Sequence, residues 1–90
     1  MKENELQRKC ISHAKSMGVY IINIQPDGKG LKGVPDLILC LNGKFVGVEL
    51  KVGNNTLSNA QKIQRNRIEK SGGMVKIIRS MSEFKELLEK

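Results

Sequence analysis

Three charged residues lie in the two most apolar segments of the sequence. Asp36 begins the segment "DLILCL", and Glu49 and Lys51 end the segment "FVGVELK". Charged side chains are rare in a buried sheet unless they are paired or bind a metal. Two carboxylates can hold a divalent cation, and an ammonium group beside them can stabilise negative charge on a phosphate ester. Such chemistry requires a fold that brings the three residues together.

The dipeptide Asn42-Gly43 between these segments predicts that they do meet. Asn-Gly is a strong signal for a two-residue type I′ hairpin turn. Counting outward from this turn places Asp36 opposite Glu49, with Cβ atoms about 4.5–5.5 Å apart. Because side chains alternate along a strand, Lys51 shares their face, and the other face is aliphatic and must be covered. A one-residue bulge would break this pairing.

Two ionised carboxylates this close repel each other, and a divalent cation between them removes the repulsion. Mg²⁺ takes oxygen ligands and commonly needs only one or two carboxylates together with water and phosphate. Taken singly, Asp36 could merely begin a strand, and Glu49 and Lys51 could lie on a solvated face. The opposed register and the shared face favour a metal site.

The remaining sequence predicts the elements that position this hairpin. Capping and periodicity signals place three helices and two further strands around it. They are a helix from Asn4 to about Gly18, a strand at 19–24, a glycine-rich loop at 25–33, a helix from Ser58 to Ser71, a strand at 74–78, and a last helix begun by a Ser80–Glu83 capping box. The order α-β-β-β-α-β-α predicts one α/β domain over residues 1–90. In it, helices flank a mixed sheet with a central antiparallel hairpin and a parallel last strand.

Charge and composition favour a nucleic acid as partner. The net charge is +7, from 16 Lys and Arg against 9 Asp and Glu, which suits a polyanion. Few aromatic residues argue against binding by base stacking, so contacts to phosphates fit better. No apolar segment is long enough to cross a membrane and no secretory signal is recognisable, so we expect a cytoplasmic protein. Cys10 and Cys40 are expected to be reduced, buried thiols.

Further motifs extend the pattern over nearly the whole chain. Pro35-Asp36 is followed thirteen residues after the aspartate by Glu49-Leu50-Lys51, and the first helix carries Glu5, while Ser58 and Gln61 follow as S-x-x-Q. These motifs resemble the VRR-NUC family of virus-type replication-repair nucleases, within the PD-(D/E)xK superfamily. The resemblance implies a restriction-endonuclease-like core and a metal-dependent endonuclease. It also implies a homodimer that cleaves branched DNA such as Holliday junctions, in a bacterium or a phage-infected cell.

The resemblance also implies roles for individual residues. Asp36, Glu49 and the backbone carbonyl of Leu50 would bind Mg²⁺ or Mn²⁺, with no small-molecule cofactor. Lys51 would orient the attacking water and stabilise the transition state. Glu5 would bind a second ion or support the first, although by itself it is an acid that the helix dipole favours in a first turn. For Gln61, a role at the site and plain buried polarity remain equally open.

The DNA-binding candidates are Lys29, Lys32, Ser58, Lys62 and Arg65. The first two lie in the glycine-rich loop that ends at Asp36, and the others lie on or next to the second helix, where solvated charge is the alternative interpretation. Two other function classes stay open. One is a non-catalytic nucleic-acid-binding module, against which the clustered acids argue. The other is a small subunit that acts on RNA or on a partner protein.

Overall fold

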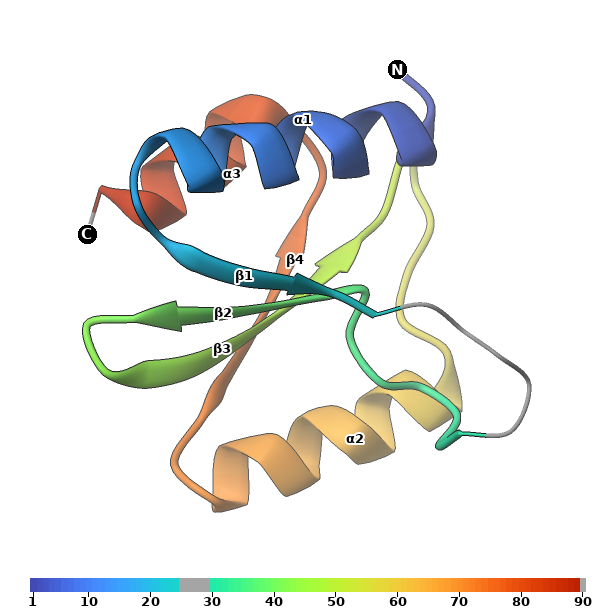
Figure 1. The fold of residues 1–90 in the computed structure, drawn as a ribbon. Coiled ribbons are helices and arrows are strands. Elements are labelled where there is room, and N and C mark those ends of the chain that lie inside the picture. Colours follow the sequence, from blue (N-terminus) through green and yellow to red (C-terminus); the bar gives the residue numbers. More distant parts are fainter. Residues whose placement is uncertain (25–29, 90) are drawn as a thin grey trace.

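The computed structural model describes residues 1–24 and 30–89. In it, a four-stranded mixed sheet lies between helices (Figure 1). Two helices, α1 and α3, lie on one face of the sheet, and α2 lies on the other. The elements are α1 (Glu3–Ser16), β1 (Tyr20–Asn23), β2 (Leu37–Leu41), β3 (Lys44–Leu50), α2 (Asn59–Lys70), β4 (Met74–Ile78) and α3 (Met81–Leu88). The predicted element order and the predicted mixed α/β sheet are confirmed.

The central hairpin has the register that the Asn42-Gly43 turn predicts. These two residues have φ of 53° and 78°, as a type I′ turn requires. The β2–β3 ladder runs out to the pair Leu37–Val48. Asp36 therefore directly precedes β2 rather than lying within it. Asp36 and Glu49 are the two positions immediately beyond the last ladder pair. β4 pairs with β3 in parallel, as expected from the crossover through α2.

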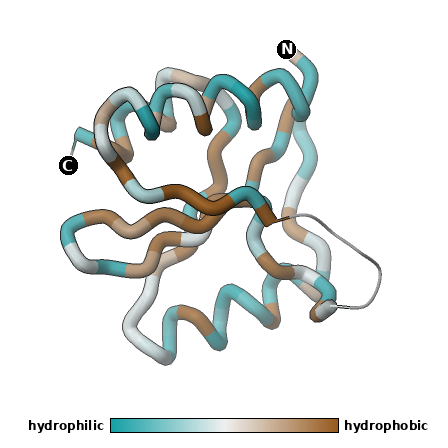
Figure 2. The backbone as a smooth tube through the Cα atoms, viewed as in Figure 1, coloured by the Kyte–Doolittle hydropathy of each residue, from teal (hydrophilic) through white to brown (hydrophobic). Residues whose placement is uncertain are grey.

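The aliphatic face of the hairpin is covered, as predicted. Its side chains form the core together with those at every fourth position of α1 and with Phe84 of α3; the buried set includes Leu6, Cys10, Ala14, Leu37, Leu39, Val46, Val48 and Leu50. Figure 2 shows that the strands are mainly hydrophobic, whereas α2 is mainly hydrophilic. Since α2 itself has no buried residue, hydrophobic burial on this helix contributes little to its position.

The predicted start of α1 needs correction, whereas Ser80 is the N-cap of α3 as predicted and only its capping box is incomplete. Lys2, not Asn4, occupies the N-cap position of α1, and it makes no side-chain capping bond. The acids Glu3 and Glu5 in the first turn favour this earlier start through the helix dipole. At α3 the Ser80 hydroxyl accepts from the backbone N–H of Glu83, as expected, but the Glu83 carboxylate accepts from the N–H of Arg79 instead of closing a capping box.

The two cysteines differ, which corrects the expectation that both are buried. Cys10 is buried and lies 3.7 Å from the sulfur of Met81, and burial raises the pKa of its thiol to about 12. Cys40 is exposed, because it faces the α2 side of β2 whereas α2 packs on β4. Within residues 1–24 and 30–89, no helix has both the length and the apolar character that a bilayer crossing demands.

The segment that leads to Asp36 is packed closely against the start of α2. Gly33 has a φ of 82°, and a Cβ at this position would lie 2.3 Å from the carbonyl atoms of Ala60 and 2.7 Å from the backbone nitrogen of Gln61. Any other residue would collide with backbone here. This contact sets the position of the chain before Asp36 relative to α2.

We therefore expect Gly33→Ala to lower the free energy of unfolding by more than the matched variant Gly18→Ala does. Gly18 also has a positive φ, 73°, but an added Cβ would meet nothing within 4 Å. The left-handed backbone costs roughly 1–2 kcal/mol in both variants, and the collision adds about 1–3 kcal/mol in the first. Urea unfolding measures the difference. Equal losses would show that the contact with Ala60 is not rigid.

Candidate active site

Asp36 is held from both sides at the end of the β2–β3 ladder. Its backbone carbonyl accepts a hydrogen bond of 3.0 Å from the N–H of Ile24. Its side-chain Oδ2 accepts one of 2.8 Å from the N–H of Leu50. The carboxylate thus satisfies a backbone donor just beyond the last ladder pair. As a result, its orientation is fixed by the two neighbouring strands.

Leu50 presents its backbone to Asp36 and its side chain to the core. The side chain is buried among the aliphatic residues, whereas the next residue, Lys51, donates its N–H to the carbonyl of Ile78 on β4. The N–H and C=O of one residue in an extended strand point to the same side. The Leu50 carbonyl therefore faces the side of β3 on which Asp36 lies.

Glu49 is the buried acid of the site. Its side chain is 1% exposed, and it is the only charged residue buried in the described part of the chain. Burial raises the pKa of its carboxyl to about 7, and the negative charge of Asp36 acts in the same direction. The ammonium group of Lys51 acts in the opposite direction and lowers the pKa. Asp36, Glu49 and Lys51 are thus electrostatically coupled, as expected if they lie together.

Gln61 connects the start of α2 to this buried carboxyl. Its Nε2 donates to Oε1 of Glu49 at 3.2 Å. Its Oε1 accepts from the N–H of Ser58 at 2.9 Å, and the Ser58 hydroxyl accepts from the N–H of Gln61 at 3.2 Å. This is a complete capping box. Because the Gln61 Oε1 accepts from the N–H of Ser58, the Nε2 of the same amide points toward the Glu49 carboxyl. The S-x-x-Q spacing is itself the sequence signal for this box.

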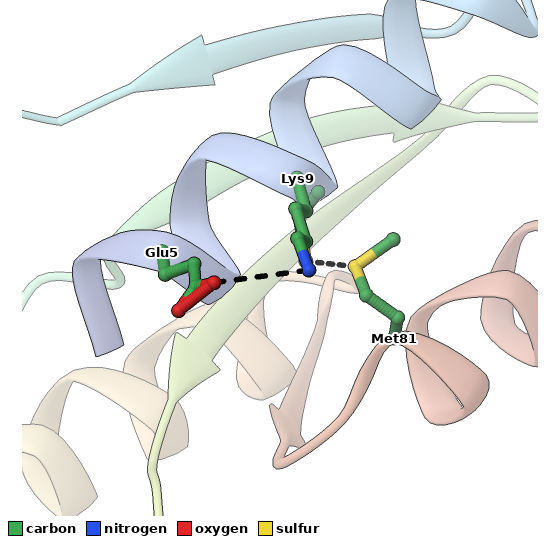
Figure 3. Close-up of polar contacts among 4 residues, drawn as sticks. Glu5, Lys9 and Met81 are labelled. Carbon is green, nitrogen blue, oxygen red and sulfur yellow. Dashed lines mark hydrogen bonds and ion pairs between the residues drawn. The ribbon is translucent and has the colours of Figure 1, made fainter. Parts of the chain in front are cut away.

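The acid of α1 that acts on Glu49 is Glu3 rather than the predicted Glu5. The charge of Glu3 raises the pKa of Glu49, and Glu3 lines a groove together with Asp36. Glu5 instead forms an ion pair of 3.9 Å with Lys9, one turn along the helix (Figure 3). The sequence signal for Glu3 is its spacing: it lies three residues before the buried Leu6 and thus on the same face of α1.

The predicted DNA-binding residues lie on several surfaces. Lys32 and Lys62 are exposed, and Arg65 is half-buried. The Nε of Arg65 is buried and has no hydrogen-bond partner among the residues that the structure describes. Ser58 uses its hydroxyl to cap α2, and Lys29 lies outside the described residues. Contact of these residues with DNA stays a prediction.

The donor set at this end of the sheet suits a hard divalent cation. It comprises two carboxylates and, on the side of Asp36, a backbone carbonyl, and all three are oxygen ligands of the kind that Mg²⁺ and Mn²⁺ prefer. The raised pKa of Glu49 means that Lys51 and Gln61 compensate its ionised form only in part, and a cation would complete the compensation. In the described residues no group of three or more His, Cys, Asp or Glu side chains surrounds one point, so a bound cation would depend on the carbonyl and on water as well.

Comparison with known proteins identifies the fold. No family model and no curated protein sequence matches this chain. Among solved structures, a "VRR_NUC domain" matches with a TM-score of 0.78 and 25% identity over 97% of this chain and 94% of that one. A "VRR_NUC domain protein" matches with a TM-score of 0.81 and 19% identity over 99% of this chain and 86% of that one. The chain thus has the fold of these VRR_NUC domains, and the similarity extends over nearly its whole length.

Proposed function

We propose that this protein is a divalent-cation-dependent endonuclease that hydrolyses phosphodiester bonds in DNA. The observation that supports this most directly is the buried carboxyl of Glu49, coupled to Asp36 and Lys51 and hydrogen-bonded by Gln61. A module that only binds nucleic acid gains nothing from acids turned toward phosphate, because they repel it. The nuclease-like fold and the positive net charge support the same function.

In this proposal Asp36, Glu49 and the Leu50 carbonyl would hold Mg²⁺ or Mn²⁺. A cation held there would supply an activated water and would neutralise charge on the phosphate. The chain's own residues orient the reactants. Gln61 holds the Glu49 carboxylate in one orientation, and the Leu50 N–H does the same for Asp36. The ammonium of Lys51 would orient the water and stabilise the negative charge that develops on the phosphate, and its positive charge would favour loss of a proton from that water to solvent.

We further propose that the substrate is branched duplex DNA, such as a Holliday junction, and that the active form is a homodimer. The likeness to VRR_NUC domains supports this step. Paired cuts across a junction require two sites related by a two-fold axis. RNA and a partner protein, the other open alternatives, are distinguished by the substrate panel below.

Asp36→Asn, Glu49→Gln and Lys51→Met should each lower kcat by at least about 100-fold, because each removes a charge from the reacting centre. The measurement is cleavage of labelled duplex, flap, four-way junction and RNA, with Mg²⁺ or with EDTA. Lys85→Gln on α3 removes a charge far from the site in the sequence and should leave kcat unchanged. Cleavage that persists in EDTA, or in all three variants, would contradict the proposal.

Without divalent cations, the stability of the wild type should fall as the pH rises from about 4.5 to about 7. Glu49 ionises near 4.5 when unfolded and near 7 when folded, so between these values the folded state binds more protons. Each pKa unit corresponds to about 1.4 kcal/mol, which gives a loss of about 3 kcal/mol relative to Glu49→Gln. Urea unfolding of both proteins checks this, and Mg²⁺ should reduce the loss. Parallel pH profiles for the two proteins would rule it out.

A homodimer should be visible by analytical ultracentrifugation at micromolar concentration, alone or with a four-way junction. In cleavage assays, the dimer should then cut both strands of a four-way junction before it dissociates from the DNA. A monomer under both conditions, combined with single nicks, would contradict the dimer but not the nuclease activity.

A further inference from the structure

A groove between α1 and β1 leads away from the candidate active site. It has a volume of about 720 Å³, and the side chains that line it include Arg8, Ser12, Lys15, Asn23 and Asp36. After Gly18 the chain reverses, so that β1 runs back beside α1 (Figure 1). A hydrogen bond from Gln7 to Asn23 joins the two walls. Apart from Glu3 and Asp36 at one end of the groove, the residues that line it have no role in the function proposed above.

Charge is segregated along the groove. Glu3 lies in the first turn of α1 and Asp36 lies beside it, whereas Lys15 lies in the last turn. At 1.5 Å per residue, Glu3 and Lys15 are about 18 Å apart along the helix axis. The acidic end coincides with the carboxylates of the candidate active site. Arg8 lies between the two ends, about 7.5 Å from Glu3 along the axis, and Lys15 lies at the far end, with Ser12 between the two cations. Two cations beyond the acidic end suit an anion that extends past the reacting group.

The spacing of the two cations suits a polynucleotide backbone. Arg8 and Lys15 are two helical turns apart, about 10.5 Å along the axis. A strand of duplex DNA advances about 3.4 Å per nucleotide along the helix axis, so two cations about 10.5 Å apart can contact two different phosphates of one strand. Ser12 lies between them as a neutral donor. Both cations are exposed, and neither is in an ion pair among the described residues.

We propose that this groove binds the phosphodiester backbone of a nucleic-acid strand next to the bond that is cut, with Arg8 and Lys15 contacting phosphates. The inference rests on the proposed function only in taking Asp36 as the reacting end. The groove directs one strand along α1, whereas the cations predicted from sequence lie on α2 and in the loop before Asp36. The groove therefore fixes the direction in which the strand leaves the centre.

The test compares two double variants that lose the same charge. Arg8→Gln/Lys15→Gln alters the groove, and Lys44→Gln/Lys85→Gln alters exposed positions that do not line it. Binding of labelled duplex DNA, four-way junction and duplex RNA is measured in EDTA over a range of salt concentrations. Equal thermal melting temperatures show that the variants are folded.

The groove variant should bind about tenfold more weakly than the control variant, and its slope of log K against log salt should be shallower by about 1.8, since each phosphate contact contributes about 0.9. In Mg²⁺ its KM should rise while kcat stays within about twofold. Equal binding and equal slopes for the two variants, or no binding of any probe by the wild type, would overturn the inference. Groove-dependent binding without any cleavage would support the groove and reject the proposed nuclease activity.

Discussion

The arrangement of the candidate site depends on one constraint, the burial of a carboxyl group at the end of β3. The Glu49 side chain is almost inaccessible to solvent, and its ionised form is destabilised by desolvation and by Asp36. A buried charge of this kind persists only with partners. Lys51 supplies an opposite charge and Gln61 supplies a hydrogen bond. One partner directly follows β3 and the other lies on α2, so the site depends on how that helix packs.

That dependence explains how a helix with no buried residue occupies a defined position. Apolar burial contributes little on α2 itself, and two polar features position its start. Ser58 and Gln61 close a capping box whose free amide donor reaches Glu49. Gly33 packs against the Ala60 carbonyl at a distance that admits no side chain. The loop that delivers Asp36 and the helix that delivers Gln61 are thereby held together, next to the hairpin that carries Glu49.

The two faces of the sheet have different tasks. α1 and α3 bury the aliphatic face and contribute the core, while the opposite face carries the charged end of the hairpin. α1 also has an outward task, since its polar side lines the groove that begins at Asp36. One amphipathic helix thus stabilises the sheet with one side and extends the charged surface of the site with the other. A chain of 90 residues has few helices and strands, so the same helix serves both the core and the surface of the site.

Local signals in the sequence determined the hairpin, its register and the end at which the charges gather. Asn42-Gly43 favours one tight turn, and the period of two along each strand then sets the cross-strand neighbours out to Leu37, the residue after Asp36. The element order and the parallel β4 followed from the same short-range patterns. Tertiary structure alone decided that Glu3 rather than Glu5 acts on the carboxyl, and that α2 leaves Cys40 exposed. These outcomes depend on the rotation of α1 and on where α2 crosses the sheet, which are set by packing between elements distant in sequence. Helical periodicity shows which residues share a face, but only the packed structure shows what that face meets.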